Sequence, residues 1–230
     1  RREFDQDVNL RPVRLLPGVP CPLADKKPGD IDFWVVRENT EDAYTGMHGF
    51  AHKGQPLEVA TQTMVYTREG VERAIRYAFH LAETRERPAG REAQVTLIDK
   101  ANAVRAHDLW QRVFAEVAKE HPGIKTDHAY IDAACMWMVK NPEWFDVAVT
   151  PNLFGDIITD LGAMNQGGMG MAASGNIHPG RVSLFEPIHG SAPKHAGKNV
   201  ASPLAAITAA GTTLDYLGEN TAATATHRSL

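Results

Sequence analysis

The chain has 230 residues, of which 43% are hydrophobic and 23% charged, a composition typical of a globular protein with one large domain or two smaller ones. Its formal net charge of −4 excludes a globally basic face, so we expect no nucleic-acid partner. It contains no apolar run of about 18 residues and no secretory signal, so we expect no membrane partner. Its two cysteines lack metal-ligand spacing, which favours a reducing cytoplasm.

Apolar runs and helical periodicity alternate along the chain. The runs are apolar at consecutive positions, as in strands buried on both faces, and the predicted strands are 31–36, 94–98, 145–150 and 181–185. The helices predicted between and after them are 67–85, 107–121 and 203–218. This alternation predicts an α/β fold. The stretch 165–181 is the most turn-rich in the chain, and "GGMGM" (167–171) within it is interpreted as a flexible connection.

Polar residues follow each predicted strand. Arg37, Lys100, Asp156 and Glu186 all lie within a few residues of a strand end. In open α/β sheets, ligands bind at the carboxyl ends of the strands. Loops are polar in any protein, but four such clusters in one chain favour a binding site.

The stretch "TPNLFGDIITDLG" places Asp156 and Asp160 four residues apart on one face of a predicted helix. Gly155 is expected to free the turn before the helix, so that Asp156 enters its first turn. A capping Asp followed by an unrelated solvated Asp would explain the pair; a bound Mg²⁺ or Mn²⁺, which prefers hard oxygen ligands, is the alternative. Asp132 is flanked by apolar residues and is expected to be buried, where it needs a cation or hydrogen-bond donors.

Five motifs in the same order resemble a known family. They are "NLRP", "VVRENTEDAY", "DKAN", "YIDAACMWMVKNPEWFDVAVTPNLFGDIITDLGA" and "FEPIHGSAPKHAGKNVASPLAAI". Together they are similar to the metal-dependent β-decarboxylating dehydrogenases, which include the isopropylmalate, isocitrate, homoisocitrate and tartrate/D-malate enzymes. The resemblance implies an isocitrate/isopropylmalate dehydrogenase-like fold of two domains around a mostly parallel sheet. It also implies a dinucleotide site without a GxGxxG loop, and the chain has no strand–GxGxxG–helix unit.

The resemblance also implies roles for the charged residues. It places the metal on Asp132, Asp156 and Asp160, with Asp132 and Lys100 reaching across a homodimer to complete a shared site. Lys100 matches the catalytic lysine. Tyr44 matches the tyrosine that protonates the enol carbon, although without its motif it would be taken for an ordinary aromatic residue.

Three arginines match positions that bind the substrate carboxylates. They are Arg1, Arg11 and Arg37, of which Arg1 is matched by spacing alone. A planar guanidinium suits a carboxylate because it donates two parallel hydrogen bonds. The implied substrate is a small hydroxy-dicarboxylate or tricarboxylate.

For the cofactor, the resemblance points to the loop after the last predicted strand. The implied NAD or NADP contacts are Asn102, Glu186, His189, Gly190, Ser191, Ala192, Lys194, His195 and Ser202. NAD-dependent members carry Asp where this chain has Lys194, and a cation there suits the 2′-phosphate of NADP. We therefore expect NADP to be used or tolerated. Ser202 replaces the usual Asn.

Relative to the family, the chain lacks an N-terminal part, with the helix that selects the substrate, and a C-terminal tail. Residues 6–168 are predicted to form the smaller dimerising domain, and 1–5 and 169–230 an incomplete nucleotide-binding domain. The stretch 46–67 is predicted to be an arm between subunits.

3-Isopropylmalate, a substrate of leucine biosynthesis, is the favoured substrate. Isocitrate, homoisocitrate and tartrate/D-malate remain alternatives. An inactive, dimer-forming remnant that binds a partner also remains open.

Overall fold

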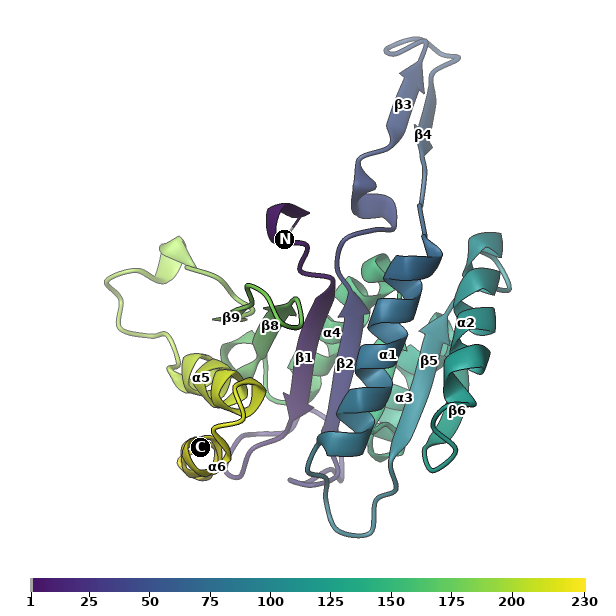
Figure 1. The fold of residues 1–230 in the computed structure, drawn as a ribbon. Helices are drawn as coiled ribbons and strands as arrows, with labels where there is room; N and C mark the ends of the chain where they lie inside the picture. The colour runs from purple at the N-terminus through teal and green to yellow at the C-terminus, as the bar shows by residue number, and fades with distance from the viewer. Residues whose placement is uncertain (1) are drawn as a thin grey trace.

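Strands and helices alternate through residues 2–230, which the computed structural model describes (Figure 1). The strands are β1 (Val8–Arg14), β2 (Asp32–Glu38), β3 (His48–Ala51), β4 (Val59–Gln62), β5 (Gln94–Asp99), β6 (Lys125–Tyr130), β7 (Val147–Thr150), β8 (Ala173–Ile177) and β9 (Leu184–Pro187). The α-helices are α1 (Arg68–Thr84), α2 (Asp108–Ala118), α3 (Ile131–Lys140), α4 (Asn152–Asn165), α5 (Leu204–Tyr216) and α6 (Asn220–Arg228). Short 3-10 helices are η1 (Arg2–Phe4), η2 (Ala43–Thr45), η3 (Arg105–His107), η4 (Pro142–Trp144), η5 (Met169–Met171) and η6 (Pro193–His195). The predicted α/β class is confirmed.

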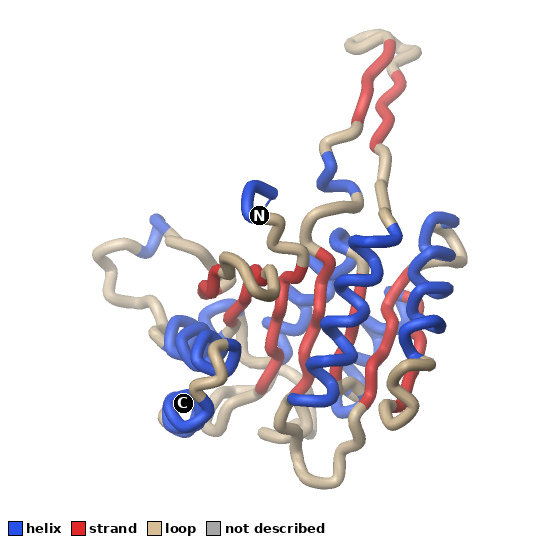
Figure 2. The backbone as a smooth tube through the Cα atoms, in the orientation of Figure 1, coloured by secondary structure: helices blue, strands red, loops and turns tan. Residues whose placement is uncertain are grey.

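Seven strands form one mixed sheet in the order β6-β5-β7-β2-β1-β8-β9, drawn in red in Figure 2. The β2–β7, β7–β5 and β5–β6 pairs are parallel, and β1 is antiparallel to both β2 and β8. Strands β2, β5, β6, β7 and β8 therefore run in one direction, and β1 and β9 run in the other. The carboxyl ends of the first four meet at one edge of the sheet, the upper edge in Figure 1.

Helices cover both faces of the sheet because successive strand residues point to opposite sides. Helices α1 and α2 pack on the face that carries Val8, Leu10 and Val36, and α3 and α4 on the face that carries Phe33 and Val35. The predicted apolar stripe of α1 is buried, and the Thr67 side chain caps this helix by accepting the Gly70 N–H at 3.0 Å. Burying each large apolar side chain contributes roughly 1.5–3 kcal/mol.

The antiparallel hairpin β3–β4 stands well away from the sheet as a narrow arm (Figure 1). Its side chains are exposed or half-buried, including Phe50 and Val59. The predicted arm is therefore present as a hairpin.

The structure differs from the sequence analysis at two points. The turn-rich stretch 165–181 contains a fully buried strand that was not predicted, β8, whereas "GGMGM" (167–171) ends in the short helix η5. Sequence reasoning missed this strand because its residues are small. Gly175 is required there because a Cβ would lie 2.7 Å from the Phe185 ring. Helix α4 begins at Asn152, so Asp156 lies beyond its first turn and the expected helix start near Gly155 is wrong.

The proposed domain division at residue 168 stays a prediction, and β8 and β9 extend the same sheet as the preceding strands. Among residues 2–230, no helix combines the length and apolar character needed to cross a membrane. Arg1 lies outside the described residues.

Candidate active site

The carboxyl ends of the parallel strands carry the predicted charged residues. Arg37 lies near the end of β2, Lys100 directly follows β5, Asp132 opens α3 after β6, and Asp156 lies on α4 after β7. Because β2, β5, β6 and β7 run in the same direction, these residues lie along one edge of the sheet. The structure therefore brings three of the four predicted clusters, together with Asp132, to the edge where open α/β sheets bind ligands. The fourth cluster, at Glu186, lies in β9, which runs in the opposite direction.

Arg37, Tyr44 and Asp156 contact one another directly. The Arg37 guanidinium, with 1% of its side chain exposed, pairs with Asp156 and donates from Nε to Asn152 Oδ1 at 2.9 Å. The Tyr44 hydroxyl donates to Asp156 Oδ2 at 3.0 Å, and its ring centroid lies 5.5 Å from the guanidinium carbon. Burial, and next the Asp156 carboxylate, raise the pKa of the Tyr44 phenol above 10.0, so Tyr44 is protonated at neutral pH.

Gly155 allows α4 to pack against the stem of Arg37. A Cβ at residue 155 would lie 2.4 Å from Arg37 Cγ, which is too close for any side chain. Sequence reasoning assigned Gly155 to a free turn, whereas its role is this close approach inside the helix.

The first turn of α4 is capped from outside the helix. The N-cap residue Pro151 supplies no side-chain cap, and the buried Asp42 accepts the Leu153 N–H at 2.8 Å instead. Asp156 and Asp160 follow one helical turn apart, so both carboxylates lie on the same face. The Asp156 side chain is 49% exposed and Asp160 is exposed, so both carboxylates are within reach of solvent.

Lys100 and Asp132 form a second pair, with Nζ and Oδ1 2.6 Å apart. The Lys100 hydrogen bond lowers the pKa of Asp132. The expectation that Asp132 is buried is wrong, because the start of α3 places this side chain at the surface, 68% exposed. The two residues predicted to act together therefore do lie together.

Oxygen donors of this kind suit Mg²⁺ or Mn²⁺. Among residues 2–230, however, no three His, Cys, Asp or Glu side chains of one chain converge to hold a metal. A site with three carboxylates therefore needs Asp132 from another copy, as the resemblance implies, and this stays a prediction.

A buried amide network links Arg11 to Glu186 in β9, one of the predicted cofactor contacts. Arg11 Nε donates to Asn9 Oδ1 at 2.7 Å, and Asn9 Nδ2 donates to Asn176 Oδ1 at 3.0 Å. Asn39 Nδ2 donates to the same Asn176 oxygen at 3.0 Å, and Asn176 Nδ2 donates to Glu186 Oε1 at 3.2 Å. Sequence reasoning missed these three asparagines. The available signal was an Asn inside each of the motifs "NLRP", "REN" and "SGNI".

The predicted cofactor residues lie mostly in the loop between β9 and α5. Gly190 and Ala192 have positive φ angles of 61° and 41°, so the loop turns sharply there. Lys194 is exposed in η6, and Ser202 Oγ accepts the Leu204 N–H at 3.3 Å beside the start of α5. The remaining predicted contacts in the loop are His189, Ser191 and His195.

Asn102 lies away from that loop, exposed in the turn after Lys100. The structure therefore places Asn102 with the strand-end residues.

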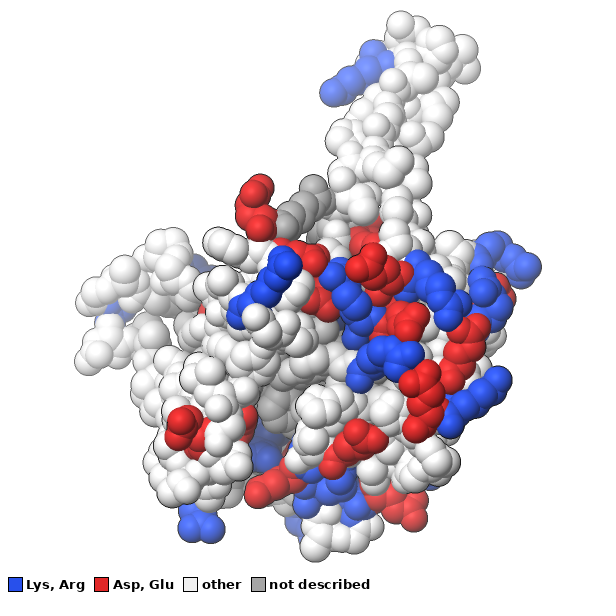
Figure 3. Space-filling model, viewed as in Figure 1, with Lys and Arg blue, Asp and Glu red and all other residues white. Residues whose placement is uncertain are grey.

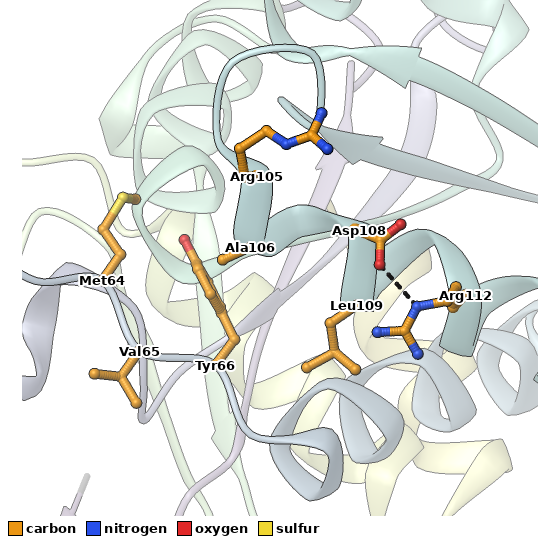
Figure 4. Close-up of a pocket in the computed structure, with 8 residues that line it drawn as sticks. All are labelled: Met64, Val65, Tyr66, Arg105, Ala106, Asp108, Leu109 and Arg112. Carbon is orange, nitrogen blue, oxygen red and sulfur yellow. Dashed lines mark hydrogen bonds and ion pairs between the residues drawn. The ribbon is translucent and has the colours of Figure 1, made fainter.

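A cavity of about 490 Å³ lies beside this edge, between the arm and α2 (Figure 4). Its lining residues are Met64, Val65, Tyr66, Arg105, Ala106, Asp108, Leu109 and Arg112. No predicted site residue lines it, and Figure 4 shows Arg112 turned to its ion pair with Asp108, 2.8 Å away. The candidate active site is thus the strand edge and not this cavity.

The mixed sheet with paired cations and carboxylates at its strand ends defines an α/β protein with a candidate ligand site at that edge. The sequence profile described as isocitrate/isopropylmalate dehydrogenase matches residues 1–230. The chain belongs to this family.

Relatives from several branches of the family are similar to the chain. It is 51% identical to the D-malate dehydrogenase [decarboxylating] of Escherichia coli strain K12, covering 95% of this chain and 60% of the relative. It is 53% identical to the 3-isopropylmalate dehydrogenase of Thermobifida fusca strain YX, covering 95% and 61%. The crystal structure of isocitrate dehydrogenase from Methylococcus capsulatus matches with a TM-score of 0.83 and 40% identity, covering 95% and 62%. The chain thus spans about three-fifths of the length of these relatives.

Proposed function

We propose that the chain belongs to a divalent-metal- and NAD(P)-dependent enzyme that oxidatively decarboxylates 3-isopropylmalate in leucine biosynthesis. The observation that carries this proposal is the pairing, at one sheet edge, of Arg37 and Tyr44 with Asp156 and of Lys100 with Asp132. These are the groups that an oxidation at a hydroxyl followed by loss of CO₂ requires.

Each side chain has one task in this proposal. Arg11 and Arg37 hold the substrate carboxylates through their guanidinium forks. Lys100 of the partner subunit removes the proton of the substrate hydroxyl while hydride passes to the nicotinamide. Tyr44, whose phenol is protonated at neutral pH, donates the proton that replaces CO₂ at the adjacent carbon.

A divalent cation would be held by Asp156 and Asp160 together with the partner subunit's Asp132. When bound, it supplies the positive charge that lowers the pKa of the substrate hydroxyl and stabilises the negative charge that develops as CO₂ departs. The exposed side chains of these residues and their oxygen donors fit such an ion.

A homodimer is part of the proposal. Helices α3 and α4 expose large apolar side chains, with Met136 64%, Val139 46%, Ile157 54% and Met164 53% exposed. The arm adds the exposed Phe50 and few charged residues (Figure 3). Contiguous apolar surface of this kind favours a protein–protein interface. We place the protein in the cytoplasm, where its two free cysteines stay reduced.

NADP is the proposed dinucleotide. The exposed Lys194 offers an ammonium to a 2′-phosphate and cannot accept hydrogen bonds from ribose hydroxyls. A kcat/KM far higher with NAD than with NADP would contradict this assignment.

D-Malate is the second candidate substrate, because a relative 51% identical to the chain carries that name. The discriminating experiment assays the purified full-length protein with Mg²⁺ and either dinucleotide on 3-isopropylmalate, D-malate, isocitrate and tartrate. The highest kcat/KM is expected on 3-isopropylmalate. The highest value on another acid reassigns the substrate, and no turnover on any acid favours the inactive remnant.

A further inference from the structure

A chain of hydrogen bonds runs from Asp42 to the backbone of Lys100 through two side chains that have no part in the proposed reaction. The Tyr66 hydroxyl lies 2.8 Å from Asp42 Oδ1, and His107 Nε2 lies 2.9 Å from the same hydroxyl. The Lys100 backbone N–H donates to His107 Nδ1 at 3.0 Å. Asp42 is the N-cap of η2, Tyr66 lies at the base of the arm, His107 ends η3, and Lys100 directly follows β5.

Only one arrangement of hydrogens satisfies this chain. A backbone N–H can only donate, so His107 Nδ1 must be unprotonated and accept. The neutral ring then carries its hydrogen on Nε2 and donates it to Tyr66, whose own hydrogen goes to the Asp42 carboxylate. Burial lowers the pKa of His107, which keeps the ring neutral, and burial together with Asp42 raises the pKa of Tyr66.

The packing around His107 holds the ring in place. Its side chain is fully buried, and its ring lies edge-on to Tyr66 and Phe154, with centroid separations of 5.0 and 5.5 Å. Phe154 belongs to α4, the helix that carries Asp156. Tyr66 and Phe154 therefore hold the His107 ring between them, and with it the chain of hydrogen bonds.

The far end of the chain is anchored to the same helix. Asp42 Oδ2 accepts the Leu153 N–H at the start of α4, and Asp42 is also the N-cap of η2, which contains Tyr44. One buried carboxylate thus ties together the segments that carry Tyr44, Asp156 and Lys100.

We infer that Tyr66 and His107 are positioning residues that fix the backbone of Lys100 against Asp42 and the start of α4, and so hold Lys100 in place to reach the partner subunit's site. This inference rests on the proposed function, because it assigns them to the reaction in which Lys100 acts. A buried polar chain contributes little net stability compared with apolar groups of the same shape, so its value here lies in geometry. A misplacement of about 1 Å of a reacting group lowers the rate by roughly 100-fold.

Two substitutions of His107 separate its two bonds. Asparagine places its Oδ1 near the position of Nδ1 and still accepts the Lys100 N–H, but it does not reach Tyr66. Glutamine places its Nε2 near the ring Nε2 and still donates to Tyr66, but it has no acceptor for Lys100. Tyr66→Phe removes only the hydroxyl, and His121→Asn is the matched control because His121 stacks on Phe79 and pairs with Glu83, outside this chain of hydrogen bonds.

The first measurement is the rate of hydrogen exchange at the Lys100 backbone amide in the full chain. The ¹⁵N spectrum of the His107 ring is recorded as well, to show which ring nitrogen carries the hydrogen. We expect exchange at wild-type rate in His107→Asn and up to about tenfold faster exchange in His107→Gln, the loss of one hydrogen bond. If His107 only filled space, the smaller Asn would disturb the packing more than Gln does. The Lys100 amide would then exchange faster in His107→Asn than in His107→Gln. The ¹⁵N spectrum is expected to show a neutral ring with hydrogen on Nε2.

The second measurement is steady-state kinetics on the substrate that gives turnover. We expect Tyr66→Phe and His107→Gln to lower kcat by roughly 10- to 100-fold with KM unchanged, and His121→Asn to leave both unchanged. A hydrogen on Nδ1, or equal exchange in the Asn and Gln variants, would overturn the inference. A wild-type chain without turnover would overturn the proposed function alone, and the exchange and ¹⁵N results would still decide whether His107 sets the place of Lys100.

Discussion

The two edges of the sheet use the same chemistry in different ways. At the lower edge in Figure 1, where β2 and β7 begin, Arg85 pairs with Asp32 and Asp146. At the upper edge, where these strands end, Arg37 pairs with Asp156. Both clusters join a buried guanidinium to carboxylates, so their difference lies in what surrounds the carboxylates.

The lower carboxylates are fully used. Only 10% of Asp32 and 4% of Asp146 is exposed, and both Asp146 oxygens are taken by Arg85, Arg87 and the Gln94 N–H. The upper carboxylates are bonded as well, Asp156 to Arg37 and Tyr44 and Asp132 to Lys100, but they remain open to solvent, with 49% of Asp156 and 68% of Asp132 exposed. Charge that is closed off stabilises the fold, whereas charge that remains open is available to a ligand.

The largest expected effect is on turnover at the upper edge. Lys100→Met is expected to lower kcat by about 10²- to 10⁴-fold, because it removes the proposed base. It should leave the urea midpoint near that of the wild type, because Lys100 pairs with the exposed Asp132. Lys119→Met, at an exposed lysine after α2, is the control for lost charge. A urea midpoint for Lys100→Met clearly below that of the wild type would contradict the proposed difference between the two edges.

The matching effect on stability belongs to the lower edge. Arg85→Met should lower the free energy of unfolding by about 3–5 kcal/mol, because it leaves Asp32 and Asp146 buried without their main partner. Arg14→Met also removes a partner of Asp32, but Arg14 is 41% exposed, so about 1 kcal/mol or less is expected. Urea unfolding measures both, and equal losses would contradict the role of burial.

A smaller effect tests how α4 packs on Arg37. Gly155→Ala forces its Cβ against the Arg37 stem and should cost roughly 1–3 kcal/mol of stability. It should also raise KM for the substrate, because Arg37 is displaced from its place beside Asp156. Gly123→Ala, which meets no atom within 4 Å, is the control. Unchanged KM and stability in Gly155→Ala would show that Arg37 does not depend on this contact.

The smallest effect is a dependence of stability on pH at the end of β5. A hydrogen bond to Asp99 raises the pKa of His128, so the folded state keeps the imidazolium proton at a pH where the unfolded state has lost it. The contribution of this bond is therefore full below the unfolded pKa of about 6.5 and is lost as the pH rises through the folded pKa. His128 is 36% exposed, so less than about 1 kcal/mol is expected.

The measurement compares the urea midpoints of wild type and His128→Gln across pH. The difference should be largest near pH 5–6, where Asp99 is ionised, and should shrink on the alkaline side. His80→Gln, at an exposed site on α1, should show no such trend. A difference that grows with pH would contradict the assigned direction.

Sequence patterns predicted the features that depend on charge and periodicity. The helical stripe of α1 and the α/β alternation follow from residues close in sequence, whereas the placing of Arg37, Tyr44 and Asp156 in one site came from the family resemblance of their motifs. The strand β8 was missed because "ASGNI" has little β-propensity and is made a strand by its neighbours β1 and β9.

Contacts between distant uncharged residues left no pattern to find. Asn9 and Asn176 are 167 residues apart, and His107 and Tyr66 are 41 apart. Their side chains form specific bonds only after the sheet and the arm bring them together. The exposure of Asp132 could not be predicted from its apolar neighbours in the sequence. On α3, Ala134 and Met138 turn inward, whereas Asp132 turns to the surface.

The most direct test mixes two inactive halves of the proposed metal site. Asp132→Asn and Asp156→Asn chains each lose one ligand, and Mn²⁺ binding to each alone should be weak. If the site is shared between subunits, unfolding and refolding the two together gives mixed dimers with one intact site, about a quarter of all sites. Recovery of tight Mn²⁺ binding, measured by electron paramagnetic resonance, is the predicted result. No recovery in dimers proven to be mixed would contradict a site built from two copies of this chain.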